Sequence, residues 1–287
     1  MDEAREQAVT DEVVDSFAGT QDDRLREIVQ SLTRHLHGFA REVRLTHEEW
    51  LAGIEFLTRV GHKTDDRRQE FILLSDVLGL SMLTVGINSP ATPAATESTV
   101  FGPFFVPTAP EVPLGGDIAH GAKGMPCWVS GTVRSTDGSP VAGARIEVWE
   151  ADEDGLYDVQ YEGDVVAGRG WLTSADDGGY RFWSVRPSHY GIPIDGPVGE
   201  LLESTGRSPM RPAHLHFKVD APGHRTLITH IFAAGDRYLD TDAVFGVKPS
   251  LVVDFAEHDP GPAPDGRVLD VRWAQVAFDI VLEPTGS

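Results

Sequence analysis

A single cysteine, Cys127, stands in this 287-residue chain, which excludes an internal disulfide framework. The chain has no Cys-x-x-Cys motif either, so a metal site built on paired cysteines is excluded. Basic residues are scarce: 24 lysines and arginines stand against 45 acidic residues, and the formal net charge is −21. A chain this acidic repels phosphate groups, so we expect neither nucleic acid nor an anionic membrane as a partner.

The chain also lacks a run of about 18 apolar residues, the length that crosses a bilayer. Its first twenty residues carry acids and no apolar centre, so we expect no signal peptide and a cytoplasmic location. No glycine-rich phosphate loop and no internal repeat is present. Hydrophobic residues make up 40% of the chain, enough for one large domain or for one domain with a helical addition.

Apolar residues recur every three or four positions in the N-terminal part. Residues 22–43 carry one apolar stripe, and Thr46 with Glu49 has the spacing of a capping box that begins a second helix. A third helix is predicted over about residues 67–85. It is apolar on more than one side, so it is either buried or covered by a partner. Residues 1–20 are polar, and we expect them to be loosely held.

The character of the chain changes after a linker. Residues 88–113 are rich in proline, threonine and alanine, and from Cys127 onward short alternating stretches are separated by turn residues. Strands are predicted at residues 128–133, 144–149, 171–173, 180–185, 214–219, 226–232, 250–255 and, as a final alternating stretch, 268–281. Short strands at this spacing predict a β-sandwich or a barrel.

The most informative stretch is Arg211-Pro212-Ala213-His214-Leu215-His216-Phe217. Polar and apolar residues alternate behind its proline, which is typical of a half-buried strand. His214 and His216 therefore share one face, about 6.6 Å apart at Cα, with Leu215 and Phe217 on the other. Two imidazoles so placed can hold one metal ion, although a bare His-x-His is more often a pair of ordinary half-buried histidines.

Two tyrosines stand just past predicted strand ends upstream, Tyr157 and Tyr190. Each alone is more often structural, with a packed ring and a bonded hydroxyl. A phenol has an ordinary pKa of about 10, so only a strongly Lewis-acidic cation would hold it as phenolate at neutral pH. Ferric iron suits hard oxygen ligands together with imidazoles, whereas zinc more often takes histidine, cysteine or carboxylate. The two tyrosines together with His214 and His216 favour an iron site.

The block from about Gly131 to Phe255 resembles the intradiol ring-cleaving dioxygenases, whose non-haem ferric iron is held by two tyrosines and two histidines. The helical start followed by a β-rich part is similar to the catechol branch of that family, and the likeness covers nearly the whole chain after about residue 22. The matching stretches are Gly155-Leu156-Tyr157-Asp158, His189-Tyr190-Gly191-Ile192-Pro193, Arg211-Pro212-Ala213-His214-Leu215-His216 and Ala234-Gly235-Asp236.

The resemblance implies a mixed α and β fold. A helical N-terminal region with its linker would occupy residues 1–110, and an antiparallel β-sandwich holding the metal would occupy residues 111–287. The family forms dimers through its N-terminal helices and encloses a lipid-like molecule there, so a homodimer with a bound phospholipid is expected.

The resemblance also implies the metal and its ligands. One Fe(III) per subunit would be held by Tyr157 and His214 in the equatorial plane and by Tyr190 and His216 on the axis. Tyr190 would leave the iron and take one of the two protons that the substrate loses. The remaining roles fall to two further residues: Arg211 would stabilise negative charge on the ring, and His230 would assist behind the ligands.

Several details resemble the members of the family that cleave hydroxyquinol rather than catechol. The segment Val100-Phe101-Gly102-Pro103-Phe104 matches their pocket loop, and His230 stands where catechol enzymes usually carry glutamine. Leu73 and Asp76 match the wall that faces the extra ring hydroxyl, from which Asp76 could accept a hydrogen bond. A buried acid paired with an arginine is an equal alternative for Asp76. The implied product is 3-hydroxy-cis,cis-muconate, which tautomerises to maleylacetate. Ile192, Pro193 and Val244 would complete the pocket wall.

Other interpretations stay open at this point. A β-sandwich binding module without a metal shares the strand pattern of residues 131–144. A cupin-like enzyme could bind ferrous iron through His214, His216 and Asp220, although Asp220 precedes a turn that would carry the acid into solvent. Within the family, catechol or a chlorocatechol could be the main substrate.

Overall fold

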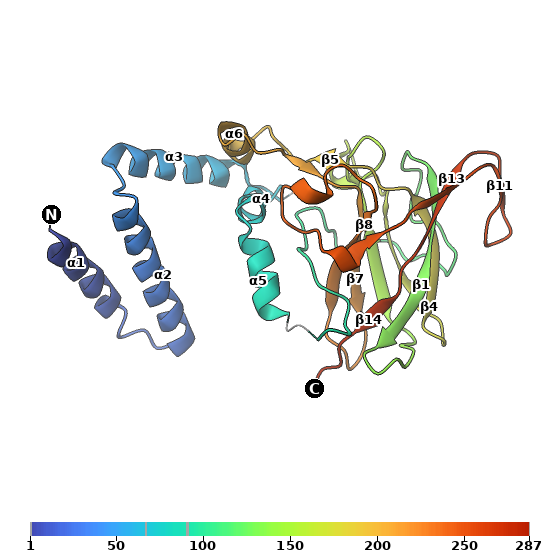
Figure 1. Ribbon diagram of the computed structural model, residues 1–287, viewed down its shortest axis with the longest axis horizontal. Helices are drawn as coiled ribbons and strands as arrows, with labels where there is room; N and C mark the ends of the chain where they lie inside the picture. Colours follow the sequence, from blue (N-terminus) through green and yellow to red (C-terminus); the bar gives the residue numbers. More distant parts are fainter. Residues whose placement is uncertain (1, 67, 90–91, 287) are drawn as a thin grey trace. The chain divides into compact units, whose positions relative to one another are not determined.

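The computed structural model describes residues 2–66, 68–89 and 92–286. The chain divides into two compact units, one ending at Arg59 and the other beginning at Val60 (Figure 1). The sequence suggested a domain boundary at residue 110, near the change from helices to strands. The compact units are defined differently, so this boundary stays a prediction.

The first unit contains α1 (Glu3–Ser16), α2 (Asp23–Glu42) and the start of α3 (His47–Lys63). The expectation that residues 1–20 are loosely held is wrong. Asp2 caps α1 by accepting a hydrogen bond from the Arg5 amide, and Thr10 is buried against α2, where Arg41 donates to its hydroxyl at 2.6 Å. The capping box is confirmed: the Glu49 amide donates to Thr46 Oγ1, and Glu49 Oε2 accepts from the Thr46 amide.

The single third helix predicted over residues 67–85 is wrong. Two helices stand there, α4 (Glu70–Val77) and α5 (Leu80–Asn88), and they are bent by 78° relative to each other. The break falls at Gly79, which has φ +73°, a left-handed conformation that glycine adopts without a Cβ clash. Within the described residues, no single helix is long and apolar enough to cross a membrane; α4 and α5 meet that test only as a bent pair.

The second unit is built on two five-stranded sheets. In the first, the order is β3-β2-β7-β8-β9, from β2 (Arg145–Trp149), β3 (Arg169–Thr173), β7 (His214–Asp220), β8 (Leu227–Ala233) and β9 (Val252–Val253). In the second sheet, β1 (Pro126–Ser135) pairs with β4 (Gly179–Val185) on one side and with β13 (Trp273–Ala277) and β14 (Ile280–Leu282) on the other. The edge strand β10 (Ala256–His258) pairs with β13. Two two-stranded sheets complete the described strands: β5 (Tyr190–Gly191) with β6 (Met210–Arg211), and β11 (Gly261–Pro262) with β12 (Val268–Leu269).

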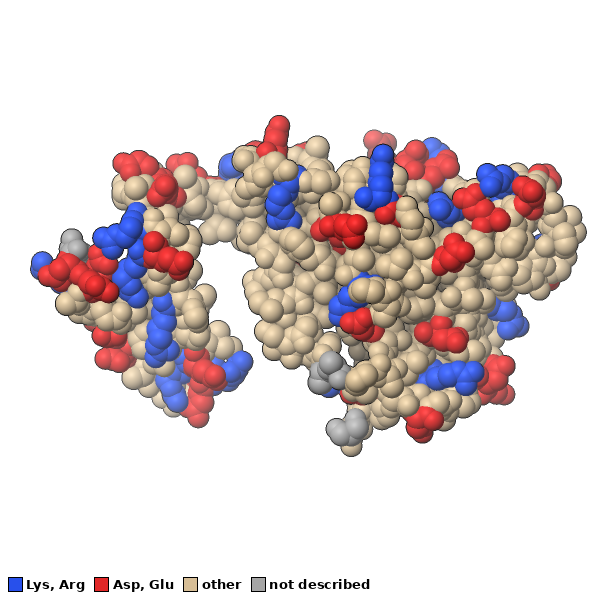
Figure 2. All heavy atoms as spheres, viewed as in Figure 1, with Lys and Arg blue, Asp and Glu red and all other residues tan. Residues whose placement is uncertain are grey.

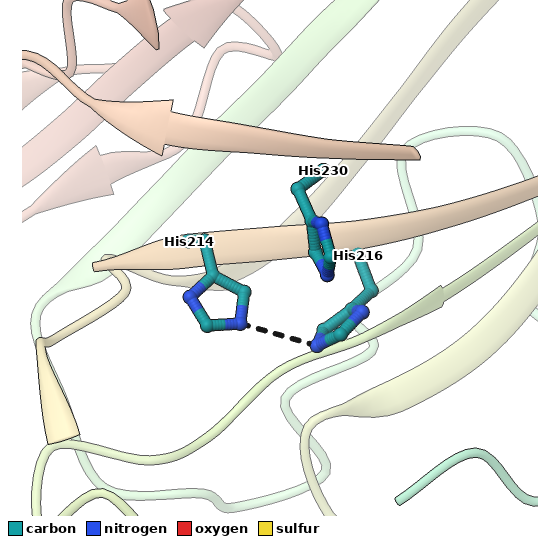
Figure 3. A group of neighbouring side chains, drawn as sticks. All are labelled: His214, His216 and His230. Atoms are coloured by element: carbon teal, nitrogen blue, oxygen red, sulfur yellow. Dashed lines mark hydrogen bonds between the residues drawn. The ribbon is translucent and has the colours of Figure 1, made fainter. Parts of the chain in front are cut away.

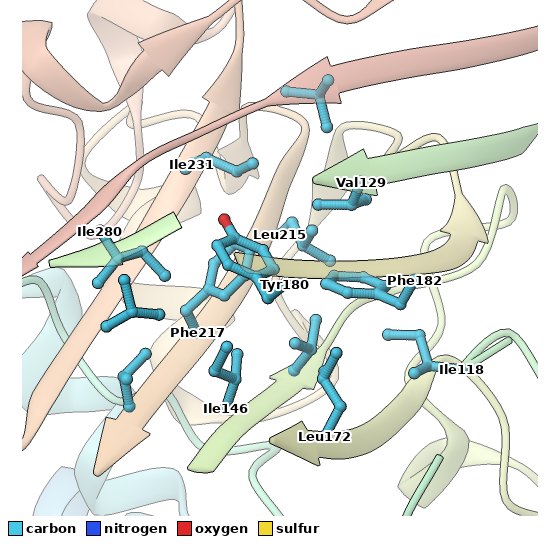
Figure 4. Close-up of a cluster of buried hydrophobic side chains, with 14 of the residues drawn as sticks. Ile118, Val129, Ile146, Leu172, Tyr180, Phe182, Leu215, Phe217, Ile231 and Ile280 are labelled. Atoms are coloured by element: carbon cyan, nitrogen blue, oxygen red, sulfur yellow. The ribbon is translucent and has the colours of Figure 1, made fainter. Parts of the chain in front are cut away.

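The inner faces of the two sheets form one apolar core (Figure 4). Leu215 and Phe217 of β7 are fully buried in it, together with Val129 of β1 and Phe182 of β4. The predicted alternation along β7 is therefore confirmed, and His214 and His216 are left on the outer face of their sheet. Apolar burial at this core drives the pairing of the sheets, at roughly 25 cal/mol per Å² of apolar surface removed from water.

Three features of the second unit differ from the expectation. The sandwich is not wholly antiparallel, because β1 pairs in parallel with β13 and β14, and β8 pairs in parallel with β9. The strand predicted at residues 250–255 is a 3₁₀ turn, Pro249–Leu251, followed by the two residues of β9, since the proline favours a turn. A helix, α6 (Pro197–Ser204), follows the loop that carries Ile192 and was not predicted; it packs against α4 (Figure 1).

Acidic and basic side chains are interspersed over the visible face of the second unit (Figure 2). The acids outnumber the bases, in line with the net charge of −21. Ion pairs at the surface, such as Arg272 with Glu257 at 2.7 Å, combine charges of opposite sign and contribute little to stability individually.

Candidate metal centre

The register of three strands builds a histidine cluster on the outer face of the first sheet. His216 of β7 lies opposite Trp149 of β2 on one side and opposite His230 of β8 on the other. Its ring stacks on Trp149 at 4.6 Å between centroids and lies 4.1 Å from the ring of His230. Figure 3 shows His214 and His216 side by side on one strand, with His230 reaching toward them from the neighbouring strand. The ligand nitrogens of the three histidines lie within 4.8 Å of one another.

The two tyrosines arrive from separate segments. Tyr157 follows a turn organised by Asp152, whose Oδ1 accepts hydrogen bonds from the amides of Asp154 and Leu156. Tyr190 belongs to β5, where it pairs with Arg211 of β6. Both rings are buried, with 2% and 7% of their surface exposed. Segments far apart in the sequence are thereby brought to the same face as the histidine pair.

Four donor atoms converge on one point. The Tyr157 hydroxyl lies 3.1 Å from the Tyr190 hydroxyl, 2.9 Å from His216 Nε2 and 3.4 Å from His214 Nε2. The two histidine Nε2 atoms are 3.2 Å apart. Ligands about 2.1 Å from one metal ion at right angles are ~3.0 Å apart, so this spacing fits a single coordinated ion.

Hydrogen bonds at Nδ1 of His214 and of His230 leave the Nε2 atom of each ring free to face the cluster. His214 Nδ1 lies 2.7 Å from the carbonyl oxygen of Pro212, so it carries the proton and donates, which directs the lone pair of Nε2 to the convergence point. His230 Nδ1 bonds to Thr99 Oγ1 at 2.5 Å, while its Nε2 is buried without a partner among the described residues. His230 stands one step behind the four donors and is oriented toward them.

The electrostatics of the site favour neutral side chains. Burial lowers the pKa of His214 to about 3, and the positive charge of Arg211 adds to the effect. Burial also places the pKa of His216 well below its ordinary value, so both imidazoles are in the unprotonated form that binds metals. Burial raises the pKa of Tyr157 and of Tyr190 above the ordinary value of a phenol. These phenols ionise at neutral pH only if a cation binds next to them.

Arg211 is a fixed positive charge beside the convergence point. It is 3% exposed, and one of its terminal nitrogens lies 3.1 Å from His214 Nε2. Asp242 holds it with bonds of 3.0 and 3.4 Å. Burial alone would raise the pKa of Asp242, but the charge and hydrogen bonds of Arg211 outweigh burial and keep that pKa below its ordinary value. The pair is therefore ionised and rigid, which suits electrostatic stabilisation of a developing anion.

Aromatic side chains of the predicted pocket loop line the site. The Phe104 ring stacks on Tyr157 at 4.5 Å, and Phe101 packs against Trp149 at 5.7 Å. Gly102 lies so close to His216 that a Cβ there would stand 3.4 Å from the imidazole Cε1, and its φ of +75° also favours glycine. The other predicted wall residues lie near the same segments, with Val100 next to Thr99, Ile192 and Pro193 after Tyr190, Val244 after Asp242, and Leu73 and Asp76 on α4. All of these except the half-buried Pro193 are buried.

Asp76 is an unusual buried acid. It is 2% exposed, and its Oδ1 has no hydrogen-bond partner within the described part of the chain. Burial raises its pKa, while a hydrogen bond with Ser81 and the charge of Arg211 partly offset that effect. Arg211 therefore acts on Asp76 electrostatically, but it forms its ion pair with Asp242. An unpaired buried carboxylate oxygen is costly unless a ligand hydrogen-bonds to it.

Three contributors to the site carried no signal in the sequence. Asp242 lies 31 residues beyond Arg211 in a loop, and Trp149 ends a strand that reads as ordinary core. Thr99 stood in the linker as one of several threonines, yet it is 1% exposed and orients His230. Each acts through a contact between distant segments, which no local pattern reveals.

The cupin-like interpretation is wrong. Asp220 ends β7 at the far end from His214, where it bonds to Lys218 at 2.6 Å and to the hydroxyl of Thr226. Its carboxylate is thus committed elsewhere and does not complete a triad with the two histidines.

Two tyrosines and two histidines that converge on the outer face of a two-sheet sandwich form a candidate site for a hard metal ion. Two family models match the chain: "Catechol dioxygenase N terminus" over residues 22–96 and "Dioxygenase" over residues 100–284. The chain therefore belongs to the intradiol ring-cleavage dioxygenases, and it is an enzyme rather than a metal-free binding module.

Individual relatives narrow the class. The hydroxyquinol 1,2-dioxygenase of Rhodococcus opacus is 63% identical over 284 residues, 98% of this chain and 95% of that protein. The hydroxyquinol 1,2-dioxygenase of Nocardioides simplex is 61% identical over 283 residues, 98% of this chain and 97% of that protein. The crystal structure of hydroxyquinol 1,2-dioxygenase from Pseudomonas putida DLL-E4 is 43% identical and covers 99% of this chain and 100% of its own, with a TM-score of 0.90.

Proposed function

We propose that the chain opens hydroxyquinol between its two adjacent hydroxyl-bearing carbons, using O2 and one non-haem Fe(III) per subunit. The observation that carries the proposal is the convergence of Tyr157, Tyr190, His214 and His216 with donor atoms 2.9–3.4 Å apart. Bound there, ferric iron would supply the Lewis acidity that ionises phenols and the one-electron chemistry that makes the ring reactive toward O2.

The donor set supports ferric iron over zinc. Two phenol oxygens become hard anionic ligands only beside a cation of high charge, because burial raises the pKa of Tyr157 and Tyr190. Two neutral imidazoles complete a set that suits ferric iron, whereas zinc sites draw on cysteine, histidine and carboxylate. No cysteine lies in the cluster; Cys127, the single cysteine of the chain, is buried in the core.

Tyr190 and Arg211 would act on the substrate directly. Two adjacent ring hydroxyls must each lose a proton when they bind side by side to a metal. We assign one of these protons to Tyr190, which would accept it as the phenolate, and the other to hydroxide from solvent. Burial raises the pKa of Tyr190, and the positive charge of Arg211 offsets part of that effect, so the phenolate that accepts the proton is less costly than burial alone would make it. Arg211, held by Asp242, would then stabilise negative charge on the ring throughout the reaction.

The extra hydroxyl of hydroxyquinol fits the unpartnered oxygen of Asp76. That hydroxyl would donate to Asp76 Oδ1, which is buried and makes no other hydrogen bond within the described chain. Catechol has no such hydroxyl and would leave the carboxylate unsatisfied, at a cost of about 1–3 kcal/mol. Two relatives above 60% identity are hydroxyquinol 1,2-dioxygenases, which supports the same substrate. The alternative is catechol or a chlorocatechol as the main substrate.

Replacing Asp76 by valine should lower kcat/KM for hydroxyquinol by about 10- to 100-fold and should leave the value for catechol unchanged or raise it, because the unsatisfied carboxylate is removed. Valine has nearly the shape of aspartate, and Ser81 keeps its 2.9 Å hydrogen bond to Ser75. Steady-state kinetics with both substrates check this. An equal loss for the two substrates would mean that Asp76 supports the fold rather than the substrate.

The reaction itself is tested with hydroxyquinol under ¹⁸O2. We expect one O2 consumed per ring opened and both labelled atoms in the acyclic diacid, apart from carboxylate exchange with water. Maleylacetate and its tautomer should be the products. Formation of a quinone without ring opening would overturn the proposal, and faster turnover of catechol would overturn the choice of substrate alone.

We also propose that the chain is a homodimer joined through its N-terminal helices. One face of α2 is apolar yet about half exposed, at 47–55%, which is costly for a surface left in water.

Light scattering should give about twice the 31.2 kDa chain mass, and a Leu32→Glu/Leu36→Glu variant should give the monomer. Organic extraction of the dimer should release a phospholipid. A parent protein of monomeric mass would contradict the proposal. The residues of this face are Leu25, Ile28, Leu32, Leu36 and Phe39, together with Val43 at the C-cap of the helix.

A further inference from the structure

We infer that Asp236 is a positioning residue that fixes the segments carrying Tyr190 and His214 relative to each other, with His189 as its partner. The inference rests on the proposed function, because it takes Tyr190 and His214 as metal ligands. Asp236 touches neither ligand; it bonds to the residue that precedes each of them in the chain.

Asp236 uses both carboxylate oxygens. Its Oδ2 accepts from the amide of Ala213 at 3.2 Å and lies 3.2 Å from Nδ1 of His189. Its Oδ1 accepts from the amide of Tyr238 at 2.9 Å, which holds the acid in its own turn after β8. The side chain of Asp236 is 7% exposed, so water competes little for these bonds.

The orientation of His189 is set from its other side. Arg237, which can only donate, places a terminal nitrogen 3.2 Å from His189 Nε2. Nε2 must therefore accept, and the proton of the neutral ring stands on Nδ1, where it points at Asp236. Tyr238 packs edge-on against the ring at 5.1 Å between centroids. The imidazole, whose side chain is 38% exposed, is thus oriented from both sides as a donor to Asp236, and its backbone leads directly into Tyr190.

The end of β8 and the turn that follows it hold Ala213, the residue before His214, through two hydrogen bonds to its backbone. The Ala233 amide donates to the Ala213 carbonyl at 2.9 Å, while the Ala213 amide donates to Asp236. Both backbone groups of Ala213 are therefore tied to the end of β8. A change at Asp236 would release one tie beside His214 and one beside Tyr190 together.

Only a carboxylate meets these demands. Ala213 and His189 donate to one oxygen and Tyr238 donates to the other, so an asparagine, which offers a single oxygen, leaves donors unpaired in either orientation. Loss of an outer partner that bonds directly to a ligand typically costs 10- to 100-fold in metal affinity or activity; Asp236 acts through one intervening residue, so we expect the lower end of that range. The geometry therefore makes the pair Asp236–His189 a determinant of how tightly and in what arrangement the metal is held.

The experiment compares iron release from Asp236→Asn with release from the parent protein, using an excess of a ferric chelator. We expect release to be about 10-fold faster and the visible phenolate-to-iron band to move or broaden. His189→Leu should behave in the same way, while His189→Asn, whose amide nitrogen replaces Nδ1, should restore most of the parent behaviour.

A matched control separates positioning from general stability. Asp265 likewise accepts from a backbone amide, that of Arg267, and from a ring N–H, that of Trp183, but outside the metal cluster. Asp265→Asn should lower Tm and leave iron release and the band unchanged. Parent-like release and spectrum in Asp236→Asn would overturn the inference. Loss of Tm alone in that variant would also overturn it. A parent protein that binds no iron would instead overturn the proposed function.

Discussion

Replacing Tyr157 by phenylalanine should abolish most of the visible colour of the iron-loaded protein and lower turnover of hydroxyquinol by at least about 100-fold. The Tyr157 hydroxyl lies within 3.4 Å of the Tyr190 hydroxyl and of the Nε2 atoms of His214 and His216. Its loss therefore removes the centre of the cluster. Outer contacts to a metal ligand are already worth 10- to 100-fold, and a ligand should be worth at least as much. The ring itself is retained, so its stacking on Phe104 persists.

Tyr180→Phe is the matched control for that experiment. Tyr180 is also a buried tyrosine of the sandwich, and its hydroxyl donates to the Phe278 carbonyl at 2.6 Å. Removing it should cost about 1 kcal/mol of stability and leave colour, iron content and turnover unchanged. If Tyr157→Phe kept its colour and turnover, Tyr157 would be a structural tyrosine and the ligand set would be wrong.

Replacing Arg211 by methionine should lower kcat for hydroxyquinol by about 100- to 1,000-fold, the usual effect of removing one fixed donor or cation that stabilises a developing anion. It should also destabilise the fold by about 3–5 kcal/mol, because Asp242 would stay buried without its counter-charge. Stopped-flow turnover and chemical denaturation measure the two effects separately.

The double variant Arg211→Met/Asp242→Asn distinguishes catalysis from stability. It removes both charges, and the asparagine keeps an oxygen that can accept from one of the amides of Val244 and Gly246. We expect most of the stability to return and the activity to stay low. Recovery of both would show that Arg211 acts only through the fold.

The parts of the fold that depend on local pattern were predictable. Alternation along residues 214–219 placed Leu215 and Phe217 in the core and the two histidines opposite, because the side-chain period of a strand is two. The capping box at Thr46 and Glu49 was equally local. The bend at Gly79 was missed because the apolar pattern continues across it, and α1 was missed because its stability comes from Thr10 and Arg41 bonding between two helices.

The same distinction between local patterns and long-range contacts applies to the candidate site. The four donors and Arg211 could be proposed from motifs and family resemblance, and the structure brings them together. The contacts that tune them could not be proposed, because Asp242, Trp149 and Thr99 act across 31 to 131 residues of sequence. Parallel pairing of β1 with β13 and β14 was missed for the same reason, since it depends on where a distant segment returns.

The central claim is that two tyrosines and two histidines hold ferric iron that binds hydroxyquinol. The most direct measurement is a visible absorption spectrum of the iron-loaded protein, before and after anaerobic addition of hydroxyquinol. We expect a red-brown phenolate-to-iron band that shifts with hydroxyquinol and shifts much less with an equal concentration of catechol. A protein that stays colourless after reconstitution with ferric iron would contradict the account.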